Sequence, residues 1–129
     1  MDKEEFSFIR CCLGKTQIQI SELLGNSLKA VQSFEQGWRS IPVHIERQML
    51  FLFSMKRNNA RKQTPCWRII KCPIETRKKC PAWEFRIGSV CWFINGTICQ
   101  GHAQENWREK MEFCRKCKVF KSTFPRLKP

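Results

Sequence analysis

The chain has 129 residues, a formal net charge of +13 and nine cysteines. It contains no apolar run long enough to cross a bilayer, and its acidic start, MDKEEFSFIRCC, lacks the apolar core of a secretory signal. We therefore expect a cytoplasmic protein without a membrane partner. In that compartment cysteines serve as metal ligands or redox thiols more readily than as disulfides.

Charge and cysteine content change together along the chain. Residues 1–55 contain six basic and six acidic residues, with only two of the cysteines. Residues 66–129 contain fourteen basic and five acidic residues and the other seven cysteines, and the intervening KRNNARKQTP is basic and ends in proline. We therefore predict a helical domain in residues 1–56, a basic linker in 57–65, a cysteine-rich module in 66–121 and a basic tail in 122–129.

The first two predicted helices follow from apolar spacing and capping residues. Apolar side chains recur at helical intervals between residues 3 and 13 and predict an amphipathic helix there. A second helix begins after Thr16, which suits an N-cap position. Its expected buried face consists of Ile20, Leu23 and Leu24.

A tight turn and a third helix follow. Gly25 suits a positive φ, Ser27 suits the N-cap of the next helix, and Gly37 suits its end. The inward residues of this third helix are expected to be Val31 and Phe34. Two helices of roughly eight to ten residues joined by a short glycine turn are typical of a helix-turn-helix.

The run TQIQISELLGNSLKAVQSFEQGWRSIP resembles the Cro/CI phage-repressor family of DNA-binding regulators. The features that match in register are Thr16, Gln17, Leu23, Leu24, Gly25, Ser27, Val31, Phe34, Glu35 and Gly37. Asn26 departs from the family, which usually carries a small apolar residue there. The resemblance implies a reader of double-stranded DNA.

In a helix-turn-helix, the second helix of the pair enters the major groove with its N-terminal residues against base edges. In this chain that helix is the third predicted helix. The expected DNA-binding residues are Gln17, Ser27, Leu28, Lys29, Gln32, Ser33 and Arg39. Lys29 suits guanine, Gln32 suits adenine, and Leu28 suits a thymine methyl group. Arg39 suits a phosphate, and the resemblance implies the same for Gln17. The competing interpretation is that these are ordinary polar residues on the surface of a helical bundle.

A fourth helix is expected from about Val43 to Lys56. Its apolar residues cover most of its circumference: Ile45, Met49, Leu50, Phe51, Leu52, Phe53 and Met55. Such a helix is expected to be buried on more than one side. It packs either against the C-terminal module or in a two-fold homodimer, and we favour the dimer, which readers of palindromic DNA require.

The seven later cysteines are candidate metal ligands: Cys66, Cys72, Cys80, Cys91, Cys99, Cys114 and Cys117. The last two form a C-x2-C pair, whose thiolates share one metal from a single turn. Tetrahedral sulfur suits an iron–sulfur cluster or zinc, and the choice between these cofactors stays open. Adding His102 would permit two four-ligand sites, although we expect His102 and His44 to be plain surface residues.

Within this module the steps Cys66-Trp67 and Cys91-Trp92 suggest a weak duplication that later spacings do not continue. Residues 93–98 predict a hairpin around Asn95-Gly96, and residues 105–114 predict a short helix. The expected fold is mainly α: a helix-turn-helix bundle of four to five helices plus a small, irregular α+β module stapled by metal.

The module resembles the prokaryotic "two-CW" cysteine-rich domains that accompany sensors and regulators. The matching elements are Cys66-Trp67, Cys80-Pro81-Ala82, Cys91-Trp92, Gly96-Thr97-Ile98-Cys99 and Cys114-Arg115-Lys116-Cys117. This resemblance implies sensing without fixing a ligand.

The expected function is therefore a sequence-specific, DNA-binding transcription regulator whose module binds metal or an iron–sulfur cluster and senses redox or metal state. The alternative is an antitoxin-like or other interaction protein with a structural zinc module. An enzyme is not expected, because the chain has two histidines, no nucleophile with an obvious base and no phosphate-binding glycine loop. No small-molecule substrate is indicated.

Overall fold

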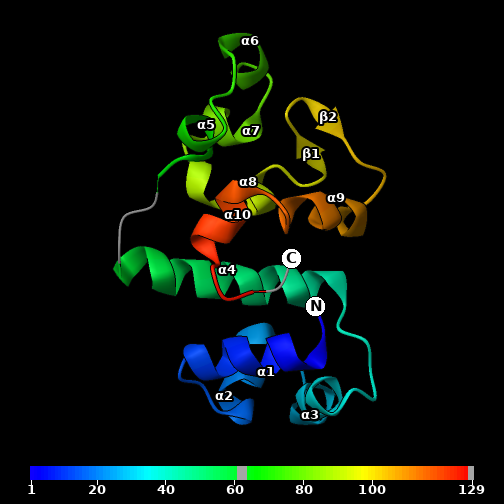
Figure 1. The fold of residues 1–129 in the computed structure, drawn as a ribbon. Helices are drawn as coiled ribbons and strands as arrows, with labels where there is room; N and C mark the ends of the chain where they lie inside the picture. The colour runs from blue at the N-terminus through cyan, green and yellow to red at the C-terminus, as the bar shows by residue number, and fades with distance from the viewer. Residues whose placement is uncertain (61–63, 128–129) are drawn as a thin grey trace. The chain divides into compact units, whose positions relative to one another are not determined.

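The computed structural model describes residues 1–60 and 64–127, with residues 58–60 as helix backbone alone. Parts of the expected linker (57–65) and of the expected tail (122–129) lie outside the described residues. The chain divides into two compact units, Met1–Lys56 and Arg57–Pro129. Both are built mainly from helices, so the predicted mainly α class is confirmed (Figure 1).

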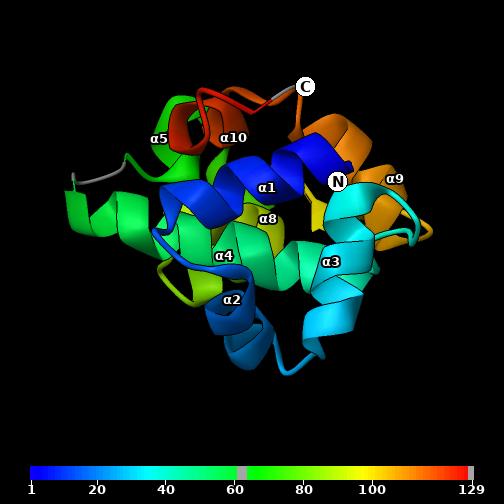
Figure 2. The same cartoon turned by 90° about the horizontal axis from the view of Figure 1, so that it is seen from below.

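The first unit contains α1 (Lys3–Cys12), α2 (Gln17–Leu24), α3 (Leu28–Gln36) and most of α4 (Val43–Ala60), whose last four residues lie past the boundary at Lys56. In both views α1 runs alongside α4 (Figure 1 and Figure 2). The expected end of the fourth helix at Lys56 is wrong, because the helix continues through Ala60 into the segment expected to be linker. No proline or glycine interrupts the sequence before Pro65, so nothing in it stops the helix earlier.

The predicted caps of α2 and α3 are confirmed. Thr16 forms a capping box with Gln19, in which each side chain accepts a hydrogen bond from the other's backbone N–H. Ser27 Oγ accepts from the Ala30 backbone N–H at 3.1 Å. Gly25 ends α2 with a φ of 69°, a left-handed conformation that favours glycine.

Helices α1–α3 share an apolar core. Phe6 of α1 meets Phe34 of α3 edge-to-face at a centroid distance of 5.8 Å, and Val31 is fully buried, as predicted. Leu23 is a correction, since its side chain is 50% exposed. The buried face of α2 holds Ile20 and Leu24, and adjacent helical residues differ in direction by roughly 100°. Leu23 therefore lies at the edge of that face.

The second unit is made of short elements. Its helices are α5 (Cys66–Ile69), α6 (Ile74–Arg77), α7 (Pro81–Glu84), η1 (Gly88–Val90), α8 (Cys91–Ile94), α9 (Trp107–Cys114) and α10 (Lys118–Thr123). Strands β1 (Ile98–Cys99) and β2 (His102–Ala103) pair antiparallel, with Ile98 opposite Ala103 and Cys99 opposite His102. The short helix predicted near residues 105–114 is confirmed as α9.

The predicted hairpin lies in the wrong place. Residues 91–94 form α8, and Gly96 follows the helix with a φ of 57°. The observed hairpin turns at Gln100-Gly101, where both residues have positive φ (51° and 84°), as a type I′ turn requires. Asn95 does not turn a hairpin, because its buried side chain is hydrogen-bonded to the residues around Cys80.

Aromatic side chains form the core beside α10. Trp92 is 1% exposed and packs edge-to-face against Phe120 and Phe124, with centroids 6.4 and 5.7 Å away. Phe124 lies beyond the boundary predicted at residue 121, so the compact unit includes the first residues of the expected tail.

In the described part of the chain, no helix combines the length and apolar character needed to span a bilayer.

Candidate functional site

Two groups of residues stand out, one in each unit. In the first unit the exposed side chains of α3 are Leu28, Lys29, Gln32 and Gln36, called here the α3 stripe. Their spacing places them along one side of the helix. Ala30, Val31 and Phe34, on the other side, are buried. The α3 stripe is therefore the face that this helix offers to another molecule.

The remaining expected DNA-binding residues lie around the ends of α3. Ser27 is exposed and caps the helix. Arg39 is exposed just beyond Gly37, and its backbone N–H donates to Ser33 O at 3.3 Å. Ser33 is half-buried, and its hydroxyl donates to the carbonyl of Lys29 at 2.9 Å. This hydroxyl hydrogen is therefore already used within the helix.

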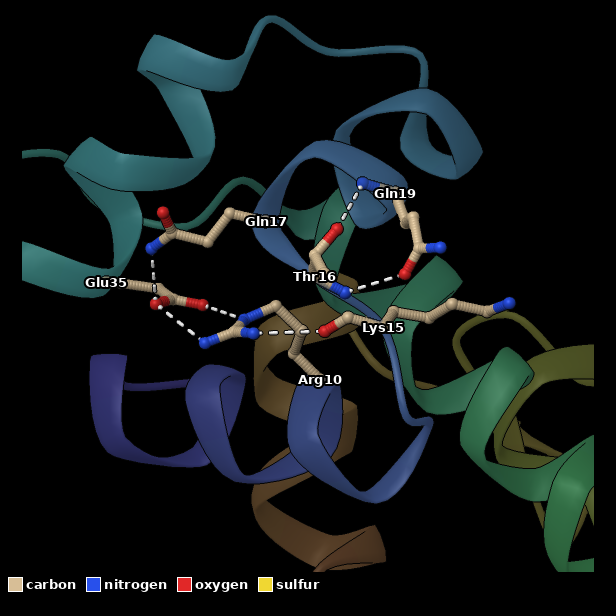
Figure 3. A network of polar contacts seen from close by, with 6 residues as sticks. All are labelled: Arg10, Lys15, Thr16, Gln17, Gln19 and Glu35. Atoms are coloured by element: carbon tan, nitrogen blue, oxygen red, sulfur yellow. Dashed lines mark hydrogen bonds and ion pairs between the residues drawn. The ribbon is translucent and has the colours of Figure 1, made fainter.

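A network of polar contacts joins three helices of this unit (Figure 3). The Arg10 guanidinium of α1 donates through Nε and Nη2 to the two carboxylate oxygens of Glu35 in α3. Its Nη1 donates to Lys15 O at 3.0 Å. The two side chains are 18% and 11% exposed, and the carboxylate raises the pKa of Arg10 further above its ordinary value. Such a two-pronged pair fixes orientation as well as distance.

Gln17, the first residue of α2, belongs to the same network. Its Nε2 donates to Glu35 Oε2 at 2.8 Å (Figure 3). Gln17 is expected to donate a hydrogen bond to a phosphate. In the chain without DNA it donates to a carboxylate instead. Its amide has two N–H groups, so one hydrogen is left for a second acceptor.

In the second unit, all seven expected metal ligands line one cavity of ≈ 460 Å³, called here the cysteine cavity. They belong to seven different elements or loops, with Cys72 in the loop between α5 and α6. Cys66 and Cys91 begin α5 and α8, Cys99 ends β1, and Cys114 ends α9. Cys80 and Cys117 are the N-caps of α7 and α10. The fold therefore gathers thiols that the sequence separates widely.

The two Cys-Trp steps occupy equivalent local positions. Cys66 and Cys91 each begin a four-residue helix, and their thiols are hydrogen-bonded to each other. This bond lowers the pKa of Cys66 and, together with burial, raises the pKa of Cys91 well above its ordinary value. One thiol of the pair is therefore more readily ionised than the other.

Burial dominates the electrostatics of two further thiols. It raises the pKa of Cys114 to about 11 and also raises the pKa of Cys99. The ammonium group of Lys110 opposes both shifts. Metal binding would have to remove protons from these thiols, so loading is coupled to pH.

Two polar side chains complete the cavity wall. Lys110 is 1% exposed, and its Nζ donates to Trp92 O at 2.9 Å and to Cys91 O at 3.4 Å. Asn95 Nδ2 donates to Cys80 Sγ at 3.4 Å, while its Oδ1 accepts from the Ala82 backbone N–H at 2.9 Å. Hydrogen bonds to sulfur and a nearby charge are the means by which proteins adjust thiolate-bound metal centres.

Gly88 sets the distance between two parts of the cavity wall. A Cβ at this position would lie 2.7 Å from Cys66 N and 2.7 Å from Pro65 Cβ. Only a glycine therefore allows the start of η1 to pack against the start of α5. Cys91 follows directly after η1, so this packing also brings Cys66 and Cys91 together.

All nine cysteines are free thiols. Cys11 and Cys12 belong to α1 and take no part in the cysteine cavity. His102 is exposed, as expected, and also lines the cavity, whereas exposed His44 belongs to α4. Among residues 1–60 and 64–127, no three or more His, Cys, Asp or Glu side chains already stand as a site for a metal ion.

Sequence reasoning missed several residues of both groups. Gln36 follows Gln32 by one helical turn and could have been found from that spacing. Arg10 and Glu35 are 25 residues apart, and Lys110 and Asn95 contact cysteines from other elements. Only the fold reveals those pairings. Comparisons of the chain with family models, curated proteins and solved structures found no match.

Proposed function

We propose that this chain is a sequence-specific, DNA-binding regulator of transcription whose second unit holds a metal centre. In this proposal α2 and α3 form the helix-turn-helix, and α3 enters the major groove of double-stranded DNA. The observation that carries the proposal is the α3 stripe, an exposed and mostly polar helix face beginning at a capped N-terminus.

The side chains of the α3 stripe match the chemistry of base edges. Lys29 donates to guanine O6 and N7, Gln32 pairs with adenine N6 and N7, and Leu28 contacts a thymine methyl group. Leu28 is 37% exposed, which leaves it accessible for such a contact. The Arg10–Glu35 pair supports this role because it holds α3 against α1, so the reading face is rigid before DNA arrives.

Phosphate contacts would position the reader. The free amide hydrogen of Gln17, at the start of α2, and the exposed guanidinium of Arg39, beyond the end of α3, suit phosphate oxygens. Residues 1–55 carry no net charge, so sequence-independent attraction to DNA must come from the basic residues that follow. A homodimer, which doubles the contacts, remains part of the proposal.

The second unit serves as a metal-binding module in this proposal. Its seven thiols would supply the ligands of zinc or an iron–sulfur cluster, and its loading would alter the affinity of the chain for DNA. The gathering of every cysteine after residue 65 around one cavity supports this assignment.

Selection of bound sequences from random duplex DNA tests the function directly, with the full chain in metal-loaded form. We expect one enriched half-site, repeated as a palindrome if the chain is a dimer. Gln32→Ala should lose preference at one base pair, whereas Gln48→Ala, an exposed glutamine of α4, should not. No enriched sequence, or equal behaviour of the two variants, would refute the proposal.

One observation favours a second function, an antitoxin-like or other protein-binding role. Ile18, Leu23 and Trp38 are 56%, 50% and 81% exposed, and large exposed apolar side chains suit a protein contact. A toxin that co-purifies with the full chain and is released by Trp38→Ser, together with a failed DNA selection, would decide for this function.

A further inference from the structure

The cysteine cavity has more thiols and more room than one zinc ion needs. A structural zinc site is closed, with four ligands converging tetrahedrally at ~2.3 Å. Here seven thiols from separate elements surround ≈ 460 Å³. That volume lies within the range of pockets that hold multi-atom cofactors. A single ion drawing four thiols together would leave much of the space unfilled.

The wall of the cavity also contains a buried lysine, whose positive charge suits a negatively charged ligand. Lys110 is buried and lines the cavity, and its Nζ donates to the carbonyls of Cys91 and Trp92. Its positive charge would lie beside an anionic group bound in the cavity and would favour such a group over a neutral one.

Asn95 supplies a hydrogen-bond donor to one of the cavity's sulfur atoms. Its oxygen is held by the backbone N–H of Ala82, which aims its Nδ2 at Cys80 Sγ. Thiolates that bind metal clusters accept such N–H hydrogen bonds, and these bonds adjust the reduction potential of the cluster. Asn95 is itself buried, so it is fixed in this orientation.

We infer that the cysteine cavity holds one polynuclear iron–sulfur group, with Lys110 and Asn95 as the positioning residues that adjust it. This inference rests on the metal-binding part of the proposed function and not on DNA binding. The ligands would be drawn from the seven cysteines of the cavity, and Lys110 would provide a fixed positive charge beside the group. Reduction adds negative charge, so a nearby cation favours the reduced state.

The first test is anaerobic loading of the full chain with ferric iron, a thiol reductant and sulfide, in parallel with zinc alone. We expect a coloured protein with more than one iron and more than one acid-labile sulfide per chain, and an electron paramagnetic resonance signal in one redox state. A colourless protein that keeps zinc in the presence of iron and sulfide would overturn the inference. A chain that binds iron without sulfide would overturn it equally.

The second test measures the midpoint potential of the loaded chain. Lys110→Met should lower it and Lys110→Arg should restore it towards the original value, whereas unchanged potentials in both would overturn the role of Lys110. If Lys110→Met does not load, Asn95→Asp provides the readout. It keeps the acceptor for Ala82, loses the donor to Cys80 and adds a negative charge. Both changes should lower the potential, and an unchanged potential would contradict the inference. A chain that loads iron and sulfide but selects no DNA would refute only the DNA-binding proposal.

Discussion

Arg10 in α1 and Glu35 in α3 form a two-pronged ion pair across 25 residues of sequence, and Gln17 of α2 joins them through the same carboxylate. The pair is mostly shielded from water. Its carboxylate is therefore the point at which the three helices are fixed to one another. Removing either partner leaves the other shielded without its counter-charge.

Arg10→Met should destabilise the first unit by about 2 kcal/mol, because Glu35 loses its charged donors. Hydrogen exchange of the α1 and α3 amides in the full chain measures this loss. The double variant Arg10→Met, Glu35→Leu should recover part of it, since no unpaired charge remains. A double variant less stable than the single one would contradict this account.

A substitution at the turn between α2 and α3 should cost stability through backbone conformation and not through steric contact. Gly25 has a φ of 69°, and a Cβ there would meet nothing within 4 Å. Gly25→Ala should therefore cost about 1 kcal/mol through backbone strain alone. Gly25→Asn should cost less, because asparagine adopts this conformation more readily. Equal losses in urea unfolding would show that the turn is limited by something else.

Phosphate and base contacts should differ in their dependence on salt. Arg39→Gln should weaken binding to every DNA sequence alike and reduce the slope of log affinity against log salt by about 0.9. Gln32→Ala should instead change the preferred base and leave that slope unaltered. Titrations of both variants at several salt concentrations measure the difference, and a base-specific effect of Arg39→Gln would contradict the assignment.

Gly88→Ala should disturb the cysteine cavity, although Gly88 is not one of the residues that line it. The added methyl group cannot fit 2.7 Å from Cys66 N, so α5 or η1 must move. We expect a loss of about 2 kcal/mol, typical of overpacking, and weaker metal loading. Ser89→Ala, the next residue, adds no atoms and should load normally. Normal loading by Gly88→Ala would show that the spacing of Cys66 and Cys91 is not critical.

The metal-free chain should lose stability at alkaline pH. Burial raises the pKa of Cys114 to about 11 from an ordinary value of 9.0, so the folded chain holds this proton more tightly than the unfolded chain. The stabilisation is fully present below pH 9.0 and is lost as the pH rises towards about 11. It amounts to on the order of 2 kcal/mol.

Urea unfolding without oxygen, followed by tryptophan fluorescence, measures this alkaline loss, since Trp92 is buried in the same unit. Cys114→Ala should reduce the loss, whereas Cys11→Ala, an exposed thiol of α1, should leave it unchanged. The same loss in Cys114→Ala would contradict the explanation.

Local signals predicted the first unit well. The caps at Thr16 and Ser27 and the turn at Gly25 involve residues within one or two helical turns, so sequence spacing reveals them. Leu23 was misplaced because its position near the edge of the apolar face is decided by how α2 packs. The Arg10–Glu35 pair is decided by packing too, and no local pattern indicates it.

Tertiary contacts overrode local signals in the second unit. Asn95-Gly96 is a strong hairpin sequence, yet the Asn95 side chain is buried and donates a hydrogen bond to Cys80, and Gln100-Gly101 makes the turn instead. The sequence indicated one group of seven cysteines, and all seven line one cavity. Their arrangement around a cavity, with Lys110 inside its wall, depends on contacts between elements far apart in the chain.

Cys66 and Cys117 lie near the two ends of the second unit and face the same cavity. A group bound to both would close a loop of about fifty residues, and the lost freedom of the unfolded chain would contribute about 4 kcal/mol. Helices α5 to α8 have four residues each, too few to be stable alone. A group bound in the cavity would thus act as a cross-link. In a cell, the amount of folded second unit would then depend on the supply of that group.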